Sequence, residues 1–90
     1  MHVWCGFGAS PEEARPELAA TMEQLYRLPF EKFERYCPYG TPEDVAAALV
    51  PYLRAGCRSF NLIPGDADGR ATVEGALAVR GLLREAQQKL

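Results

Sequence analysis

The segment Gly6-Phe7-Gly8 has residue types and a spacing that could do chemistry. Its two glycines stand between a β-prone stretch and a helix start at Ser10, which matches part of a dinucleotide-binding turn, where free N–H groups at a helix N-terminus bind phosphate. The match is incomplete, because Pro11 takes the place of the third glycine and no acidic residue follows a second strand at the required spacing. This motif alone does not predict nucleotide binding.

Asn61 is the most informative polar residue, because it stands inside an otherwise apolar run, 60–63. Either its amide pairs with groups of a neighbouring strand, or it points into a site. The helix starts at Ser10 and Thr41 are candidate anion sites, although most capped helix starts bind nothing. The sole histidine, His2, has no Cys or Ser partner at a recognisable motif spacing, so we expect no catalytic role for it.

The composition predicts one globular domain spanning residues 1–90. The chain is 48% apolar and 24% charged, which argues against disorder. Its net charge of -2 and its scattered basic residues give no electrostatic reason to bind nucleic acid. No apolar run reaches the roughly 20 residues that span a bilayer, and the first residues lack the features of a signal peptide. We therefore expect a cytoplasmic protein with no membrane partner.

The three cysteines, Cys5, Cys37 and Cys57, are widely spaced and form no C-x-x-C pair. With only one histidine in the chain, they do not match a zinc site, so no metal is expected. In a cytosolic protein they are predicted to be small buried hydrophobic residues rather than reactive thiols.

The clearest folding signals lie between residues 40 and 64. Thr41 is a typical N-cap, Pro42 fits the first helical position, and Asp44 completes a capping box. Gly56 follows the helix as a left-handed C-cap would. The apolar run that comes next predicts a strand covered on both faces in a parallel sheet.

The N-terminal helix is predicted from Ser10 onward, with Pro11 at its first position. Pro16 conflicts with a regular first turn, so either that turn is distorted or the regular helix begins near Pro16. One apolar stripe at helical spacing predicts that this helix packs on a sheet; it consists of Ala14, Leu18, Met22, Leu25 and Tyr26.

Strands and helices alternate along the whole chain. The expected elements are a strand at 2–5, the helix from Ser10, a short aromatic helix within 30–36, an extended piece at 36–39, a helix at 41–54, a strand at 60–63, a loop at 65–69 and a helix at 71–90. This alternation predicts an α/β fold with two or three parallel strands. Such a sheet leaves two open edges, so we expect the chain to associate with itself as a homodimer or larger homo-oligomer.

Four runs of the sequence resemble the C-terminal part of the bacterial luciferase-like monooxygenases. They are WCGFG at 4–8, LPFEKFERY at 28–36, GTPEDVA at 40–46 and AGCRSFNLIP at 55–64. The family comprises (β/α)8-barrel oxidoreductases that use FMN or a deazaflavin (coenzyme F-420). The resemblance implies a partial (β/α)8 barrel, about the last three βα units with their covering helices, without the first five strands of the barrel.

The resemblance also implies where a cofactor would bind. In a parallel barrel the working side is the C-terminal end of the strands, so the candidate cofactor-binding residues are Trp4, Gly6 and Asn61. Trp4 could stack on an isoalloxazine ring or could pack in the core. No catalytic residue is indicated.

Two functions remain open at this point. The first is a fragment or subunit of a luciferase-like flavin- or deazaflavin-dependent oxidoreductase, active only if oligomerisation rebuilds the cofactor site. The second is a non-catalytic, self-associating α/β module derived from that barrel. The first function requires the ends of the strands to surround a cavity that can hold a cofactor. The second function is favoured if packed side chains fill the space at those ends.

Overall fold

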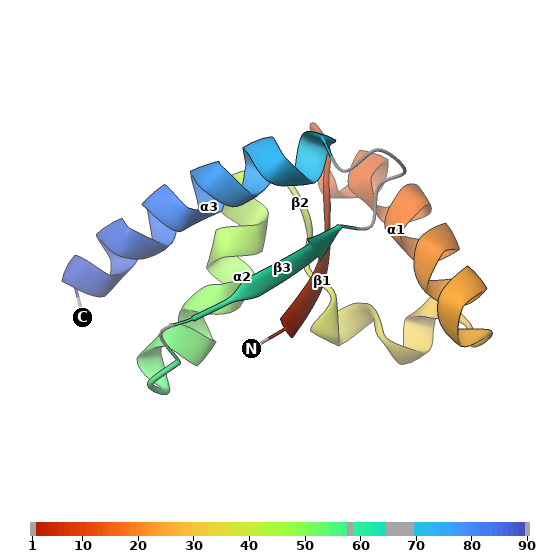
Figure 1. Cartoon of the computed structure of the whole chain (residues 1–90), viewed down its shortest axis with the longest axis horizontal. Helices are drawn as coiled ribbons and strands as arrows, with labels where there is room; N and C mark the ends of the chain where they lie inside the picture. Colours follow the sequence, from red (N-terminus) through yellow and green to blue (C-terminus); the bar gives the residue numbers. More distant parts are fainter. Residues whose placement is uncertain (1, 58, 65–69, 90) are drawn as a thin grey trace.

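The computed structural model describes residues 2–57, 59–64 and 70–89. In this part of the chain three parallel strands form one sheet, and helices lie on both of its faces (Figure 1). The elements are β1 (His2–Phe7), α1 (Pro11–Tyr26), two short 3-10 turns, η1 (Phe30–Lys32) and η2 (Glu34–Tyr36), β2 (Tyr39–Gly40), α2 (Pro42–Arg54), β3 (Asn61–Pro64) and α3 (Arg70–Gln88). The predicted α/β class with two or three parallel strands is confirmed, with three strands in the described sheet. The loop predicted at 65–69 lies outside the described residues.

The strand order is β2-β1-β3, with β1 in the centre. β2 pairs with the end of β1, Gly6 opposite Tyr39, whereas β3 pairs with its beginning, His2 opposite Asn61. Consecutive barrel units would place their strands side by side in chain order, with every helix on one face. Here β3 lies beside β1 and not beside β2, as in a doubly wound sheet. The partial barrel is therefore not confirmed.

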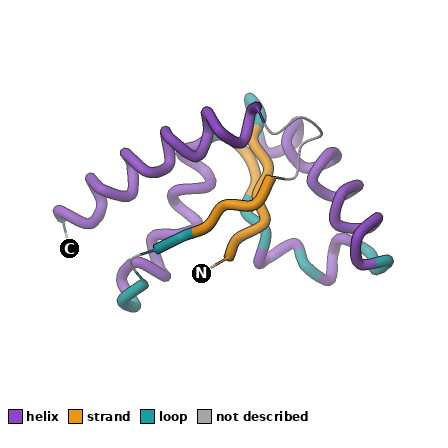
Figure 2. The backbone as a smooth tube through the Cα atoms, viewed as in Figure 1, coloured by secondary structure: helices purple, strands orange, loops and turns teal. Residues whose placement is uncertain are grey.

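The alternation of side chains along β1 divides the core into two layers. Val3 and Cys5 point to one face, where they pack against α2 and α3. Trp4 points to the other face, toward α1. The tube view in Figure 2 shows α1 on one side of the strands and α2 with α3 on the other. Hydrophobic burial on both faces of the central strand thus holds all three helices.

The larger core cluster joins β1 to α2 and α3, and it consists of Val3, Cys5, Val45, Ala46, Leu49 and Val79. The smaller one joins α1 to the aromatic connector, the segment 27–38 between α1 and β2, and consists of Leu18, Met22, Phe30 and Cys37. Cys5 and Cys37 are buried as predicted, whereas Cys57 is partly exposed after the end of α2.

The predicted start and stop of α2 are confirmed. The Thr41 side chain accepts a hydrogen bond from the Asp44 N–H, and the Asp44 carboxylate accepts one from the Thr41 N–H, which forms the capping box. At the other end Gly56 has φ +110°, and its N–H donates to the Leu53 carbonyl while the Cys57 N–H donates to the Tyr52 carbonyl. These two bonds form a Schellman motif, which satisfies the last carbonyls of the helix.

The predicted stripe of α1 is only partly buried. The helix begins at Pro11 and runs through Pro16, so it does not start near Pro16. Ala14 and Leu18 are buried, but Leu25 and Tyr26 are 57% and 49% exposed, because α1 extends past the short strand that it covers. Leu25 therefore adds little to the core, whereas the half-exposed Tyr26 still packs its ring against Trp4.

The prediction that β3 is covered on both faces is wrong. β3 is an edge strand with β1 as its only neighbour in the described sheet, and Leu62 and Ile63 are partly exposed. The α3 residues Val73 and Leu77 are apolar, yet they are 62% and 63% exposed. An open surface therefore lies where α3 runs along the free edge of the sheet.

Candidate functional site

The structure does not bring together the three residues predicted to bind a cofactor. Gly6 lies near the C-terminal end of β1, whereas Asn61 begins β3 and stands opposite His2. Gly6 lies four residues along the strand from His2, a distance of about 13 Å. The Asn61 amide nitrogen lies 3.0 Å from His2 Nδ1, so Asn61 pairs with a neighbouring strand, one of its two predicted roles.

Trp4 is half-buried in the layer that faces α1. Its ring packs edge to face with Tyr26, their centroids 6.5 Å apart, and Tyr26 in turn lies 5.3 Å from the Phe33 ring. These contacts support the core-packing alternative for Trp4.

Gly6 and Gly8 allow α1 to lie directly on the end of β1. A Cβ atom at Gly6 would come within 3.1 Å of Leu18 Cβ, and one at Gly8 within 3.0 Å of the Ala14 backbone nitrogen. Both glycines are therefore explained by close helix–strand packing, which is one of the roles of glycine in dinucleotide-binding turns.

The two candidate anion sites at helix starts are already satisfied within the chain. The Ser10 side chain accepts from the Glu13 N–H, and Thr41 shares its capping box with Asp44. Both first turns carry acidic side chains, which repel an anion. Both helix starts are therefore unfavourable places for a phosphate.

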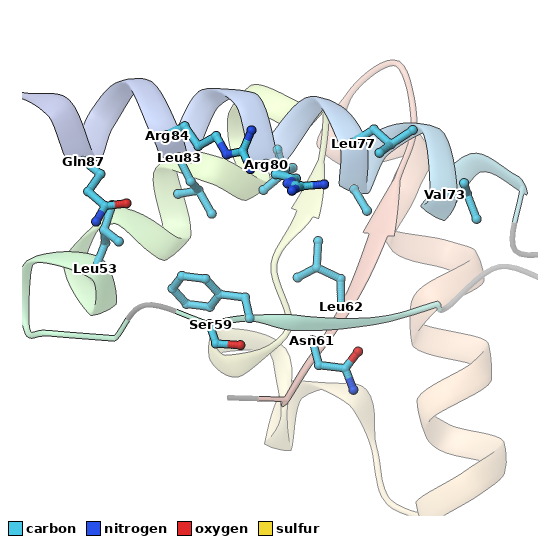
Figure 3. A pocket seen from close by; sticks show the side chains of 13 residues that line it. Leu53, Ser59, Asn61, Leu62, Val73, Leu77, Arg80, Leu83, Arg84 and Gln87 are labelled. Atoms are coloured by element: carbon cyan, nitrogen blue, oxygen red, sulfur yellow. The ribbon is translucent and has the colours of Figure 1, made fainter.

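A groove of about 660 Å³ lies between β3, the end of α2 and the length of α3 (Figure 3). Leu53, Phe60 and Leu62 supply its apolar floor, and α3 lies over Leu62 in Figure 3. The remaining lining residues of α3 are Val73, Ala76, Leu77, Val79, Arg80, Leu83, Arg84 and Gln87. A hollow of this size and composition is typical of small-molecule sites.

Arg80 and Arg84 make one side of the groove positive. They are four residues apart on α3, so their side chains project from the same side of the helix. No carboxylate is among the described lining residues, and in the described part of the chain neither arginine has an acidic partner. Both are exposed at the groove. Two guanidinium groups beside an apolar floor favour a ligand with an apolar body and an anionic end.

Asn61 also lines the groove, so one predicted site residue belongs to it. Its amide points away from α3 in Figure 3 and lies at the edge of the hollow. The sequence-based search missed Arg80 and Arg84. The available signal was a pair of arginines at helical spacing on a helix whose apolar residues are not all buried.

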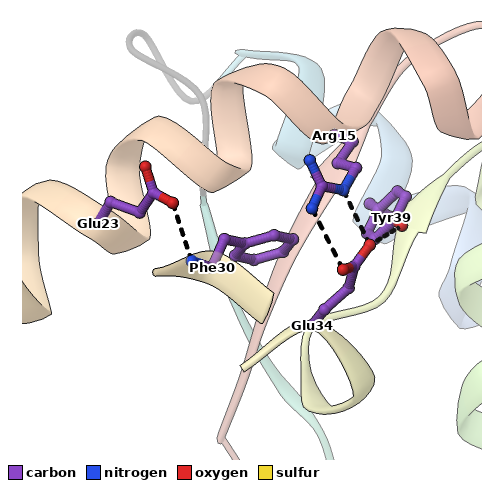
Figure 4. A network of polar contacts seen from close by, with 5 residues as sticks. All are labelled: Arg15, Glu23, Phe30, Glu34 and Tyr39. Atoms are coloured by element: carbon purple, nitrogen blue, oxygen red, sulfur yellow. Dashed lines mark hydrogen bonds and ion pairs between the residues drawn. The ribbon is translucent and has the colours of Figure 1, made fainter. Parts of the chain in front are cut away.

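A second polar cluster has a structural role (Figure 4). Arg15 donates from Nε and Nη2 to the two carboxylate oxygens of Glu34, at 2.8 and 3.2 Å, and the Tyr39 hydroxyl donates to the same carboxylate. The hydrogen bonds from Arg15, and then from Tyr39, lower the pKa of Glu34 from 4.5 to about 2. Nearby, the Phe30 N–H donates to the Glu23 carboxylate over 2.8 Å. These contacts hold the connector against α1.

A smaller hollow of about 270 Å³ lies beside this cluster, lined in part by Cys37, Tyr36 and Tyr52. Burial raises the pKa of the Cys37 thiol, which disfavours the reactive thiolate. Within residues 2–57, 59–64 and 70–89, no cluster of His, Cys, Asp or Glu could hold a metal ion. The groove over β3 is therefore the better candidate for a ligand site.

Comparisons with protein-family models, with curated proteins and with solved structures find no match to this chain. The resemblance to luciferase-like monooxygenases thus stays a prediction. None of the helices in the described ranges has the length and apolar character needed to cross a membrane.

Proposed function

We propose that this chain is a flavin-binding unit of the luciferase-like oxidoreductase type, and that the cofactor binds in the groove between β3 and α3. FMN and the deazaflavin coenzyme both join a planar ring system to an anionic tail. The observation that carries the proposal is that one hollow combines an apolar floor with two guanidinium groups that have no described acidic partner. Its volume falls in the range of small-molecule pockets.

Each part of the groove has a distinct role toward such a ligand. Phe60 and Leu62 offer apolar contact to the ring system. Arg80 and Arg84 donate paired hydrogen bonds to the phosphate, for which the planar guanidinium is well suited. When bound, the flavin supplies hydride transfer or oxygen activation, and the chain's own residues bind and orient it. Catalysis requires assembly that completes the site.

The test is a fluorescence titration of the purified chain with FMN and, separately, with the oxidised deazaflavin coenzyme. We expect saturable binding in the micromolar range and much weaker binding of riboflavin, which has the ring but lacks the phosphate. A hydrogen bond to a charged group contributes about 1.5–3 kcal/mol. Replacing both groove arginines, Arg80→Gln with Arg84→Gln, should therefore weaken FMN binding by at least about 10-fold.

Arg54→Gln is the matched control, because Arg54 is exposed on α2 and does not line the groove. This variant should bind FMN as the unaltered chain does. If neither cofactor saturates the protein, or if riboflavin binds as tightly as FMN, the proposal is wrong.

The second candidate function is the non-catalytic, self-associating α/β module. The free edge of β3 and the exposed apolar residues of α3 favour it. A dimer that forms without any cofactor and never binds one would support this function over the first.

A further inference from the structure

The two halves of α3 are held unequally by the rest of the fold. In the first half Gly75 is buried against the Phe7 ring, and Val79 is 1% exposed in the larger core cluster. In the second half, residues 80–88, no residue is buried, and the two leucines pack only in part on that cluster. Figure 1 shows these last turns extending past β3. Segments with few buried apolar contacts are the ones that move at low cost in free energy.

Gly81 stands at the boundary between the two halves. A Cβ atom there would meet nothing within 4 Å, so packing does not require a glycine at this position, in contrast to Gly75. Gly81 is exposed and follows the buried Val79 by two residues, which places it on the opposite side of the helix. Helices bend with their convex side toward water, so a glycine on this side eases a bend of α3 toward the sheet.

The same boundary separates the polar residues of the groove. Arg80 comes before Gly81, whereas Arg84 and Gln87 follow it, and all three line the groove. On a regular helix two like charges four residues apart repel each other, and in the described part of the chain no acidic group pairs with either arginine. An anion held by Arg80 removes this repulsion and attracts Arg84. A bend at Gly81 would then move Arg84 and Gln87 toward the ligand.

We infer that Gly81 is a hinge: a phosphate-bearing ligand in the groove draws residues 82–88 toward β3, and Arg84 closes over the phosphate. Gly81 itself does not contact the ligand, so it is a positioning residue that acts through Arg84. This inference rests on the proposed function. Riboflavin has no phosphate to attract Arg84, so it leaves the hinge open.

Gly81→Ala tests the hinge without altering the groove, because Gly81 is not among the lining residues. Alanine favours the straight helix, so the variant should be more stable than the unaltered chain when no ligand is present. In a fluorescence titration the same variant should bind FMN about 5-fold more weakly and riboflavin with unchanged affinity. A glycine with a purely structural role would give the gain in stability without a loss of affinity.

The matched control moves the glycine by three positions, by combining Gly81→Ala with Ala78→Gly. Ala78 is exposed on α3 and lies outside the groove lining. The double variant keeps the number of glycines in the helix, so it should have the stability of the unaltered chain. It should still bind FMN about 5-fold more weakly, because the glycine no longer stands between the two arginines.

Hydrogen exchange followed by mass spectrometry measures the closure directly. Saturating FMN should slow the exchange of the amides in residues 82–88 of the unaltered chain, and riboflavin should not. In Gly81→Ala the slowing by FMN should be smaller.

The outcomes separate the inference from the function on which it rests. If Gly81→Ala binds FMN as tightly as the unaltered chain, the inference is overturned and the function stands. Full affinity in the double variant also overturns it, because the effect would then follow helix propensity and not the position of the glycine. Unchanged exchange of residues 82–88 with bound FMN has the same meaning. If the unaltered chain binds no FMN, the function and the inference fail together.

Discussion

Two glycines in α3 should respond in opposite ways to the same substitution. Helix propensity alone predicts that Gly→Ala stabilises the interior of a helix by about 1 kcal/mol. Gly81 is exposed, and a Cβ atom there would meet nothing within 4 Å, so Gly81→Ala should raise the free energy of unfolding by about 1 kcal/mol. Gly75 is buried, and its Cβ would lie 2.5 to 2.7 Å from three ring atoms of Phe7.

Those distances are well inside van der Waals contact, so Gly75→Ala forces α3 or the Phe7 ring to move. Overpacking of this kind costs about 1–3 kcal/mol, which offsets or exceeds the gain in propensity. The two variants should therefore differ by about 1–3 kcal/mol, with Gly75→Ala the less stable. The assay is urea unfolding of the ligand-free chain followed by far-UV circular dichroism.

Combining Gly75→Ala with Phe7→Leu provides the control for this steric explanation. The smaller side chain makes room for the added methyl group, so the double variant should lose less stability than the two single changes together. Equal stabilisation by Gly75→Ala and Gly81→Ala would refute the reasoning, because α3 would then not pack over β1 as described.

Two further stability effects follow from the core and the polar cluster. The pKa of Glu34, lowered from 4.5 to about 2, means that its contribution to stability is complete above pH 4.5 and is lost as the pH falls toward 2. Glu34→Gln should remove this part of the pH dependence, and urea unfolding between pH 7 and pH 3 checks it; an unchanged pH profile would contradict the contact with Arg15. Leu49 is 1% exposed in the larger core cluster, so Leu49→Ala should cost about 2–5 kcal/mol, whereas Tyr52→Ala, at a position 39% exposed, should cost less in the same assay.

The local elements could be predicted from the sequence because their signals are short-range. The capping box at Thr41, the glycine after α2 and the glycine-containing turn after β1 each act over a few residues, and all three are in the structure. Their residue types restrict the backbone directly.

The strand order could not be predicted, because alternating strands and helices fit both a barrel and a doubly wound sheet. The difference is whether β3 pairs with β2 or with β1. That choice depends on contacts between distant residues, such as Val79 with the layer that contains Val3 and Cys5. No short-range signal in the sequence specifies it.

The residues of the candidate groove could also be predicted only in part from the sequence. The sequence drew attention to Asn61, a polar residue in an apolar strand, and the structure places it at the groove. Arg80 and Arg84 look like ordinary surface charges of an amphipathic helix, which is the common role of such residues. They become notable only when α3 is seen to lie over a free strand edge.

The groove exists because α3 is longer than β3, the strand beside which it lies. The 19 residues of α3 extend over about 28 Å, whereas the four residues of β3 extend over about 13 Å. The helix therefore runs along more surface than its own strand can cover, and Val73 and Leu77 remain exposed although they are apolar. The groove is therefore open because the sheet beneath α3 ends at β3.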